Sequence, residues 1–149
     1  MTIGTICNRE VVMARKDAAV QEVAQLMRQY HVGDLVVVED HGAVRIPVGI
    51  LTDRDLVVEV LAKGVAPDTV TAGDIMTTDI VTGREGDSIW ATLQRLRNKG
   101  IRRLPVVDGE GGLVGILTMD DLLELFAGEL ADLSKLISRE QEREKAARK

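Results

Sequence analysis

The sequence contains few aromatic residues and one cysteine. Tyr30, Trp90 and Phe126 are the only aromatics in 149 residues, so valine, leucine and isoleucine have to build the core. Cys7 has no second cysteine to pair with. This excludes an internal disulfide and a cysteine-based zinc site.

Clustered positive charge and long apolar runs are also missing. The formal net charge is −5, and the first 90 residues contain no arginine-rich block, so we expect no nucleic-acid partner. No stretch approaches 18 apolar residues, and the opening MTIGTICNRE has no apolar core of a signal peptide. The sequence therefore predicts a soluble, cytoplasmic protein without a membrane partner.

No set of residues in the sequence resembles a catalytic centre. His31 and His41 lack the spacing of metal ligands, and neither a paired nucleophile and base nor a matched pair of acids is recognisable. We therefore expect no enzyme activity, no catalytic residue, no bound metal and no catalytic cofactor.

An internal repeat covers most of the chain. The stretch VGILTDRD, which begins at Val48, returns as VGILTMDD from Val114. Earlier positions match at an offset of 69 residues, and by Val48 the offset has fallen to 66. The first copy therefore carries three extra residues, within the segment DHGAVRIP opposite GEGG, and we expect that segment to be a loop between two strands.

Each copy has the hydrophobic pattern of a β-α-β-β-α unit. The β-branched runs VVMA and IVTG predict first strands, and helices follow, over 18–29 in one copy and with Ile89, Leu93 and Leu96 on one face in the other. The runs DLVVVE and RLPVVD predict strands that turn back into the two VGILT strands, and second helices are expected over 53–62 and 120–127. A unit this small has a marginal core, so we predict an α+β fold in which two repeats pack sheet against sheet with pseudo-two-fold symmetry.

The domain limits follow from this pattern. We predict a first repeat over 1–66, a second over 67–128, a linker over 63–71 and a helical tail over 129–149. In the tail, apolar residues form a stripe that we expect to dock on a helix of its own module or of a second copy: Leu130, Leu133, Leu136 and Ile137. Residues 138–149 are wholly polar and predict a solvated, fraying helix.

The Thr-x-x-Asp that closes each VGILT phrase has two interpretations. In the first, it is a capping box, in which threonine and aspartate satisfy free backbone N–H groups at the start of a helix. In the second, the aspartate accepts two hydrogen bonds from a ribose diol, with the threonine hydroxyl beside it. Both roles can coexist in one residue pair.

The repeats resemble the cystathionine-β-synthase (CBS) family. Phrases like AGDIMTTDIVT, GIRRLPVVD and VGILTxxD, in this order and over residues 3–128, are similar to those of a CBS domain pair, or Bateman module. The resemblance implies that adenosine-containing ligands bind between the repeats and act as a regulatory signal. It also implies a homodimer of modules.

The same resemblance implies two ligand sites, and the residues of this sequence make them unequal. The first consists of Thr52, Asp55, Arg102 and Arg103, with Ile50, Ile80 and Val81 flanking an adenine. The second, weaker site consists of Thr118, Asp121, Ile116, Val11 and Val12. At the positions that match Arg102 and Arg103, the first repeat has Gly33 and Asp34, so we expect the second site to lack phosphate donors.

The expected function is that of a regulatory module that senses an adenosine ligand of the AMP, ADP or ATP type. Its signal passes to a protein partner that the sequence does not identify. Two alternatives stay open: a protein–protein interaction or dimerisation module without a metabolite ligand, and a sensor of S-adenosylmethionine or NAD.

Overall fold

The buried runs of β-branched residues form the central strands of two three-stranded sheets. A computed structural model describes residues 1–148, which divide into two units, 1–117 and 118 onward. The first repeat contains α1 (Ile3–Ile6), β1 (Met13–Arg15), α2 (Val20–Tyr30), β2 (Asp34–His41), β3 (Val44–Thr52), α3 (Asp53–Leu56) and a π-helical turn, η1 (Val57–Leu61). The second contains α4 (Ala72–Ile75), β4 (Gly83–Arg84), α5 (Ile89–Lys99), β5 (Arg103–Val107), β6 (Leu113–Thr118) and α6 (Met119–Ala147).

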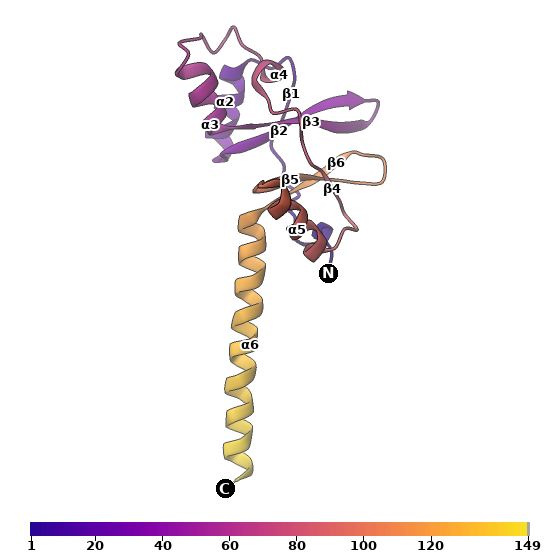
Figure 1. Ribbon diagram of the computed structural model, residues 1–149, viewed down its shortest axis with the longest axis vertical. Coiled ribbons are helices and arrows are strands. Elements are labelled where there is room, and N and C mark those ends of the chain that lie inside the picture. Colours follow the sequence, from indigo (N-terminus) through magenta and orange to yellow (C-terminus); the bar gives the residue numbers. More distant parts are fainter. Residues whose placement is uncertain (149) are drawn as a thin grey trace. The chain divides into compact units, whose positions relative to one another are not determined.

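Both sheets have the same strand order (Figure 1). The order is β1-β2-β3 in one sheet and β4-β5-β6 in the other, and β1 and β4 run parallel to their central neighbours. The strand β3 runs antiparallel to β2. Each parallel pair is joined through a helix, α2 or α5, because such a crossover needs a long connection. The expectation of an α+β fold with two repeats is confirmed.

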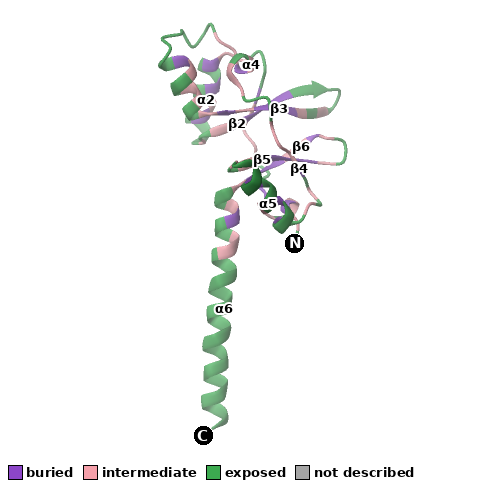
Figure 2. Ribbon diagram, in the orientation of Figure 1, coloured by how far each residue is buried: buried purple, intermediate pink, exposed green. Residues whose placement is uncertain are grey.

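The two sheets meet through apolar residues of their central and last strands. Val36 and Val38 of β2 form a buried cluster with Ile116 of β6, and Val11 and Met13 pack against it. Purple, buried segments in Figure 2 follow these strands. A second cluster joins α2 to the outer side of the first sheet.

The opening segment of each repeat is bound by the other repeat. In α1, the N–H of Gly4 donates to the carbonyl of Glu85 at 3.0 Å, and in α4 the N–H of Gly73 donates to the carbonyl of Lys16 at 2.9 Å. A Cβ at Gly4 would lie 2.8 Å from the Glu85 carbonyl oxygen, so this approach requires glycine. The segments before β1 and β4 are thus exchanged between the repeats.

The hairpin of the first repeat differs from the sequence prediction. The segment expected to be a loop belongs mostly to β2 and β3, where Asp40 pairs with Arg45 and His41 with Val44. Gly42 makes the turn with a φ of 67°. The three extra residues lengthen a hairpin, and the loop prediction for 40–47 is wrong.

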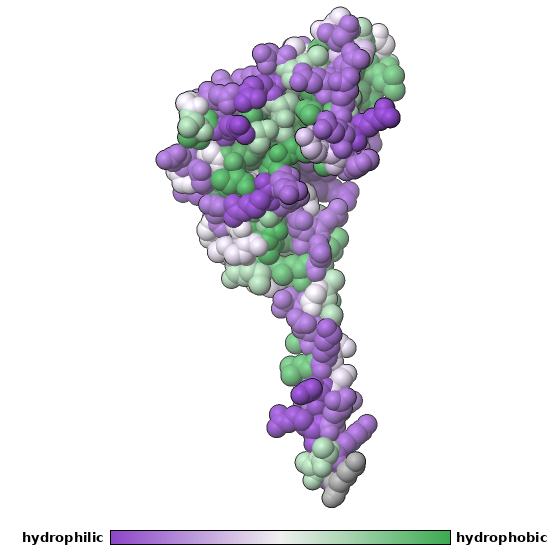
Figure 3. Space-filling model, turned by 180° about the vertical axis from the view of Figure 1, so that it is seen from behind, coloured by the Kyte–Doolittle hydropathy of each residue, from purple (hydrophilic) through white to green (hydrophobic). Residues whose placement is uncertain are grey.

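The helices after the repeated VGILT phrase also depart from expectation. The helix predicted over 53–62 is an α-helical turn followed by the π-turn η1. The helix predicted to end at Ala127 instead continues to Ala147 as one helix, α6. All residues from Ala127 to Arg148 are exposed, and apolar side chains interrupt the polar surface of this helix in Figure 3.

Candidate ligand pocket

One pocket in residues 1–117 contains all seven residues expected at the first site. Its volume is about 250 Å³. The predicted residues in its lining are Ile50, Thr52, Asp55, Ile80, Val81, Arg102 and Arg103. Sequence reasoning missed Thr77, Asp79 and Ile101, which also line it.

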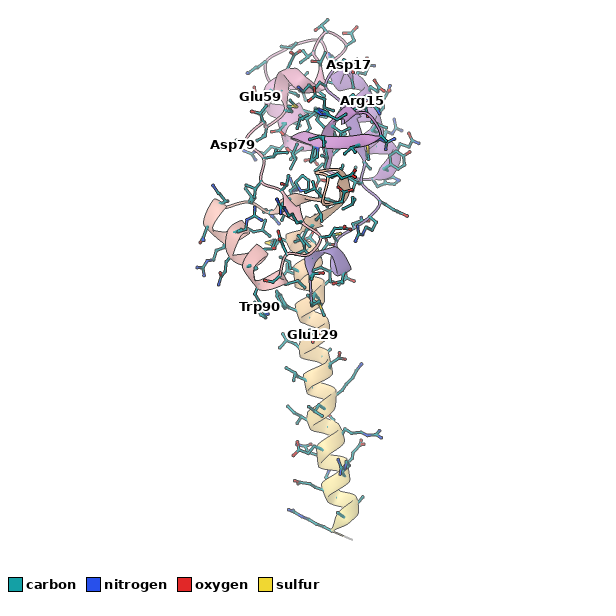
Figure 4. The ribbon with its side chains drawn as sticks, turned by 90° about the vertical axis from the view of Figure 1, so that its right-hand side faces the viewer. Arg15, Asp17, Glu59, Asp79, Trp90 and Glu129 are labelled. Carbon is teal, nitrogen blue, oxygen red and sulfur yellow. The ribbon has the colours of Figure 1, made fainter. Side chains whose placement is uncertain are left out.

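Local structure positions the two sides of this pocket. Thr52 and Asp55 stand where β3 runs into α3, and Arg103 begins β5. The segment after α4 is held against β3, because Ile50 and Thr77 exchange two backbone hydrogen bonds, of 3.1 and 3.0 Å. Asp79 lies further along this connection between α4 and β4 (Figure 4).

The capping interpretation of Thr-x-x-Asp is correct at both copies. The Thr52 hydroxyl accepts from the Asp55 N–H at 3.1 Å, and Asp55 Oδ2 accepts from the Thr52 N–H at 2.9 Å. Thr118 and Asp121 make the same box, with distances of 3.3 and 2.9 Å. Since a carboxylate has about four acceptor positions, the bond to Oδ2 leaves Asp55 able to accept from a ligand as well.

A third Thr-x-x-Asp shows that the spacing alone does not define a pocket. Asp74 Oδ2 accepts from the Thr71 N–H at 2.9 Å at the start of α4. These bonds from Thr71 lower the pKa of Asp74. The motif marks a helix start, and only tertiary structure decides which copy faces a cavity.

Arg103 is paired with an acid of the first repeat. Its Nε lies 3.0 Å from Oδ2 of Asp34, and both side chains are mostly buried, with exposures of 31% and 23%. The Nε–H is not aligned for a hydrogen bond, so the contact is an ion pair and this buried donor has no hydrogen-bond acceptor among the described residues. The sequence-based hypothesis had assigned Asp34 to the second site, and the ion pair with Arg103 was not predicted. Asp34 is in the lining of neither pocket.

The environment of Asp34 opposes its charge. Burial removes water from the carboxylate and raises its pKa, Arg103 acts in the opposite direction, and the nearby Asp53 charge raises the pKa further. Asp34 thus neutralises part of the positive charge beside the pocket while being poorly stabilised itself.

A second pocket, of about 550 Å³, occupies the equivalent place in the first repeat. Most of its lining matches the first pocket at the offset of 69 residues: Asn8 with Thr77, Glu10 with Asp79, Val11 with Ile80, Val12 with Val81 and Val32 with Ile101. Met13, Leu26 and Tyr30 complete it. No lysine, arginine or histidine is in this lining.

The structure only partly unites the residues expected at the second site. Val11 and Val12 line the pocket of the first repeat. Ile116 is instead buried in the cluster between the sheets, and its backbone pairs with Asn8. Thr118 and Asp121 cap α6 in the second unit, and their membership in the site stays a prediction.

Two repeated three-stranded units with exchanged opening segments and a cleft at the strand–helix junction define a paired-domain module. The chain belongs to the CBS domain family, whose profile matches residues 3–62 and 72–128. It is 34% identical over 142 residues to the uncharacterized protein MK0525 of Methanopyrus kandleri, covering 95% of this chain and 71% of that one. The catalytic relatives share only the CBS part: inosine-5′-monophosphate dehydrogenase of Mycobacterium tuberculosis is 38% identical over 115 residues, which are 76% of this chain and 20% of the enzyme.

Solved structures of the family include a ligand complex and an oligomer. The CBS domain pair of protein MJ0100, in complex with 5′-methylthioadenosine and S-adenosyl-L-methionine, superposes with a TM-score of 0.74 at 26% identity, covering 87% of this chain and 98% of that one. A hexameric CBS-CP12 protein from bloom-forming cyanobacteria superposes with a TM-score of 0.72 at 29% identity, covering 83% and 66%. Among the described residues, no helix is long and apolar enough to cross a membrane, and no cluster of acids, histidines and cysteines could hold a metal ion.

Proposed function

We propose that this protein is a non-catalytic regulatory module that binds an adenosine-containing ligand in the pocket of Thr52, Asp55, Arg102 and Arg103. The observation that carries the proposal is the meeting of a diol acceptor, two guanidinium groups and four apolar side chains, from both repeats, in one cavity. Charge-assisted bonds of this kind contribute about 1.5–3 kcal/mol each. The ligand complex of MJ0100 supports an adenosyl ligand.

The charges of this pocket favour a ligand of low net charge. Two acids, Asp55 and Asp79, stand against two arginines, and Arg103 is already shared with Asp34. Arg102 is therefore the principal free phosphate donor. Within the predicted AMP, ADP and ATP series, we propose that the monophosphate fits best, and a zwitterionic adenosyl ligand such as S-adenosylmethionine is the second candidate.

The other pocket is proposed to bind a ligand without phosphate. Its lining has the carboxylate of Glu10 and the phenol of Tyr30 but no cation. A carboxylate repels a phosphate and tolerates an uncharged or positively charged group. One nucleotide per chain, with a weaker second event for adenosine, is the expected stoichiometry.

A thermal-shift screen tests the proposal. The ligands are AMP, ADP, ATP, S-adenosylmethionine, 5′-methylthioadenosine and NAD, and binding at 100 times Kd stabilises the fold by about 2.7 kcal/mol. Calorimetry on any ligand that raises the midpoint then gives its stoichiometry. If none of the ligands shifts the midpoint, the chain is an interaction or dimerisation module without a metabolite.

We also propose that the module forms a homodimer and signals to a protein partner. Apolar side chains on η1 are exposed, with Val57 at 52%, Val58 at 44% and Leu61 at 75%. Adjacent exposed apolar residues of this kind are typical of protein interfaces. Sedimentation at micromolar concentration should give twice the chain mass, and a strict monomer contradicts the dimer.

A cytoplasmic location stays a prediction, as do the repeat limits 1–66 and 67–128.

A further inference from the structure

Helix α6 carries large apolar side chains in water. Leu123, Leu130, Leu133 and Ile137 are 57–67% exposed, and Leu136 is 62% exposed. The second half of the helix makes no hydrophobic contact that buries it, because every residue from Ala127 to Arg148 is exposed (Figure 2). Exposed apolar surface of this kind is unfavourable in water, so the stripe is expected to be covered by a partner.

The spacing of the stripe is that of a coiled-coil seam. Its members are separated by alternating steps of four and three: Met119, Leu123, Phe126, Leu130, Leu133 and Ile137. In heptad terms, Leu123, Leu130 and Ile137 occupy position a, and Met119, Phe126 and Leu133 occupy position d. Ile137 at a with Leu133 at d has the combination that favours two strands, and the other seam positions are apolar residues that are not β-branched.

A partner would also stabilise the exposed helix. Most helical stability in proteins comes from packing of an apolar face, and the residues of α6 from Ala127 on are all exposed. Gly128 makes this worse, since a glycine inside a helix costs about 0.5–1 kcal/mol relative to alanine. Gly128 occupies heptad position f, on the side away from the seam, and a Cβ there would touch nothing within 4 Å.

The charges beside the seam fit a second copy of the same helix. In a parallel pair, each g residue faces the e residue five positions later on the other helix. In the exposed part of α6 these pairs are Glu129 with Ser134 and Leu136 with Gln141, and neither brings two like charges together. Leu122, also at g, is already buried within the chain. An antiparallel pair would instead place g beside g, with Glu129 against Glu129.

The acidic residues of the segment lie mostly away from the seam. Asp121, Glu124 and Asp132 fall at positions f, b and c. Two acids lie beside the seam within the paired region, Asp120 at e and Glu129 at g, and Figure 4 labels Glu129 on α6. Self-association of a chain with net charge −5 therefore meets little repulsion along this face.

We propose that α6 pairs with α6 of a second copy as a short, parallel, in-register coiled coil with its seam from Met119 to Ile137. This interface is separate from the exposed residues of η1 and does not require a ligand. The wholly polar end of α6 extends beyond the seam.

Two matched double variants test the interface in the full chain. Leu130→Glu with Leu133→Glu places two acids in the seam, and Ala131→Glu with Ser138→Glu places two acids on position b of the same helix. Sedimentation dilution series should show the seam variant dissociating at about tenfold or higher concentration, while the b variant behaves as wild type. Equal dissociation of the seam variant and wild type overturns the proposal.

Cysteine cross-linking tests the orientation and does not depend on folding of the seam variants. Ile137→Cys is at the last a position of the seam, and Lys135→Cys is at position f. In a parallel, in-register pair, residue 137 faces itself, so oxidation should give a disulfide-linked dimer that the 135 variant does not form. The native Cys7 is buried and is the same in both variants. Equal cross-linking of the two variants, or none, overturns the parallel pairing, whatever the ligand screen shows.

Discussion

The two pockets of the module have equivalent walls and different charges. Five lining positions correspond between them at an offset of 69 residues, and both contain one acid on the segment before the first strand, Glu10 or Asp79. The difference lies at the entrance of the central strand. Where one repeat has Arg102 and Arg103, the other has Gly33 and Asp34. The repeated backbone thus supplies two cavities with five matching lining positions, and the one with Arg102 and Arg103 in its lining has the positive charge that an anion needs.

Asp34 belongs to the first repeat but acts on the pocket that includes Arg103, because the two side chains form an ion pair across the repeats. Asp34 lines neither pocket, and it reduces the positive charge beside the pocket of Arg103. The predictions below test this electrostatic difference, in order of decreasing effect.

Removing both arginines should cause the largest loss. Arg102→Ala with Arg103→Ala removes the phosphate donors and should weaken AMP binding by about 2–4 kcal/mol in calorimetry. Any weaker binding of adenosine at the pocket of Tyr30 should persist, because that lining contains no arginine. Two equal nucleotide events per wild-type chain would show that the assignment of the pockets is wrong.

The aspartates of the three Thr-x-x-Asp motifs should separate capping from ligand binding. Asp55→Ala should weaken nucleotide binding by about 1.5–3 kcal/mol, because the ribose diol loses a charged hydrogen-bond acceptor. Asp74→Ala removes an equivalent capping bond outside the pocket and should leave the affinity unchanged. Asp121→Ala should barely alter the strong event, and abolition of binding by this variant contradicts the model of unequal sites.

Asp34→Asn should improve the anion site. The substitution keeps the shape of the side chain and releases Arg103 from its ion pair, so AMP affinity should rise by roughly 1 kcal/mol, about fivefold. Adenosine, which has no phosphate, serves as the matched ligand and should bind as before. An unchanged or reduced AMP affinity would mean that the arginine does not reach the phosphate.

His31→Gly should raise the free energy of unfolding, because His31 has a left-handed backbone conformation that glycine adopts more easily. His31 ends α2 in the left-handed region with a φ of 54°, whereas its counterpart Gly100 ends α5 at 65°. A non-glycine residue in this conformation costs about 1–2 kcal/mol. Glycine removes this cost but also makes the unfolded chain more flexible, which stabilises the unfolded state, so we expect a net gain of about 0.5–1 kcal/mol. Denaturant unfolding measures it, and Gly100→His should produce the opposite change.

The raised pKa of Asp34 should make the stability of the folded protein depend on pH. Its raised pKa means that the folded state holds the proton more tightly than the unfolded state, whose pKa is near the ordinary 3.8. The free energy of unfolding contributed by this residue is therefore greatest below pH 3.8 and falls as pH rises through the raised value. Thermal midpoints of wild type should decline over this window relative to Asp34→Asn, and a constant difference would contradict the raised pKa.

The sequence by itself determined the repeat, the order of the strands within each copy and the absence of a disulfide. These features depend on local patterns, namely β-branched runs, helical spacing and the Thr-x-x-Asp at helix starts, which fix structure over a few residues. The set of seven pocket residues was also accessible, because the family resemblance paired positions in VGILTDRD with positions in GIRRLPVVD. Their role in binding remains a proposal.

Only the tertiary structure decided which side chains of different repeats meet. Three features join residues that the local sequence pattern does not pair. They are the contacts of Gly4 and Gly73 with the other repeat, the lengthened hairpin, and the ion pair of Asp34 with Arg103. Thr71 and Asp74 have the same spacing as Thr52 and Asp55, yet only the latter pair lines the pocket of Arg102 and Arg103. Spacing specifies the helix start, whereas packing of the sheets and the strand-entry charges specify the environment, because the free energy of a charged group depends on the burial and charges that surround it.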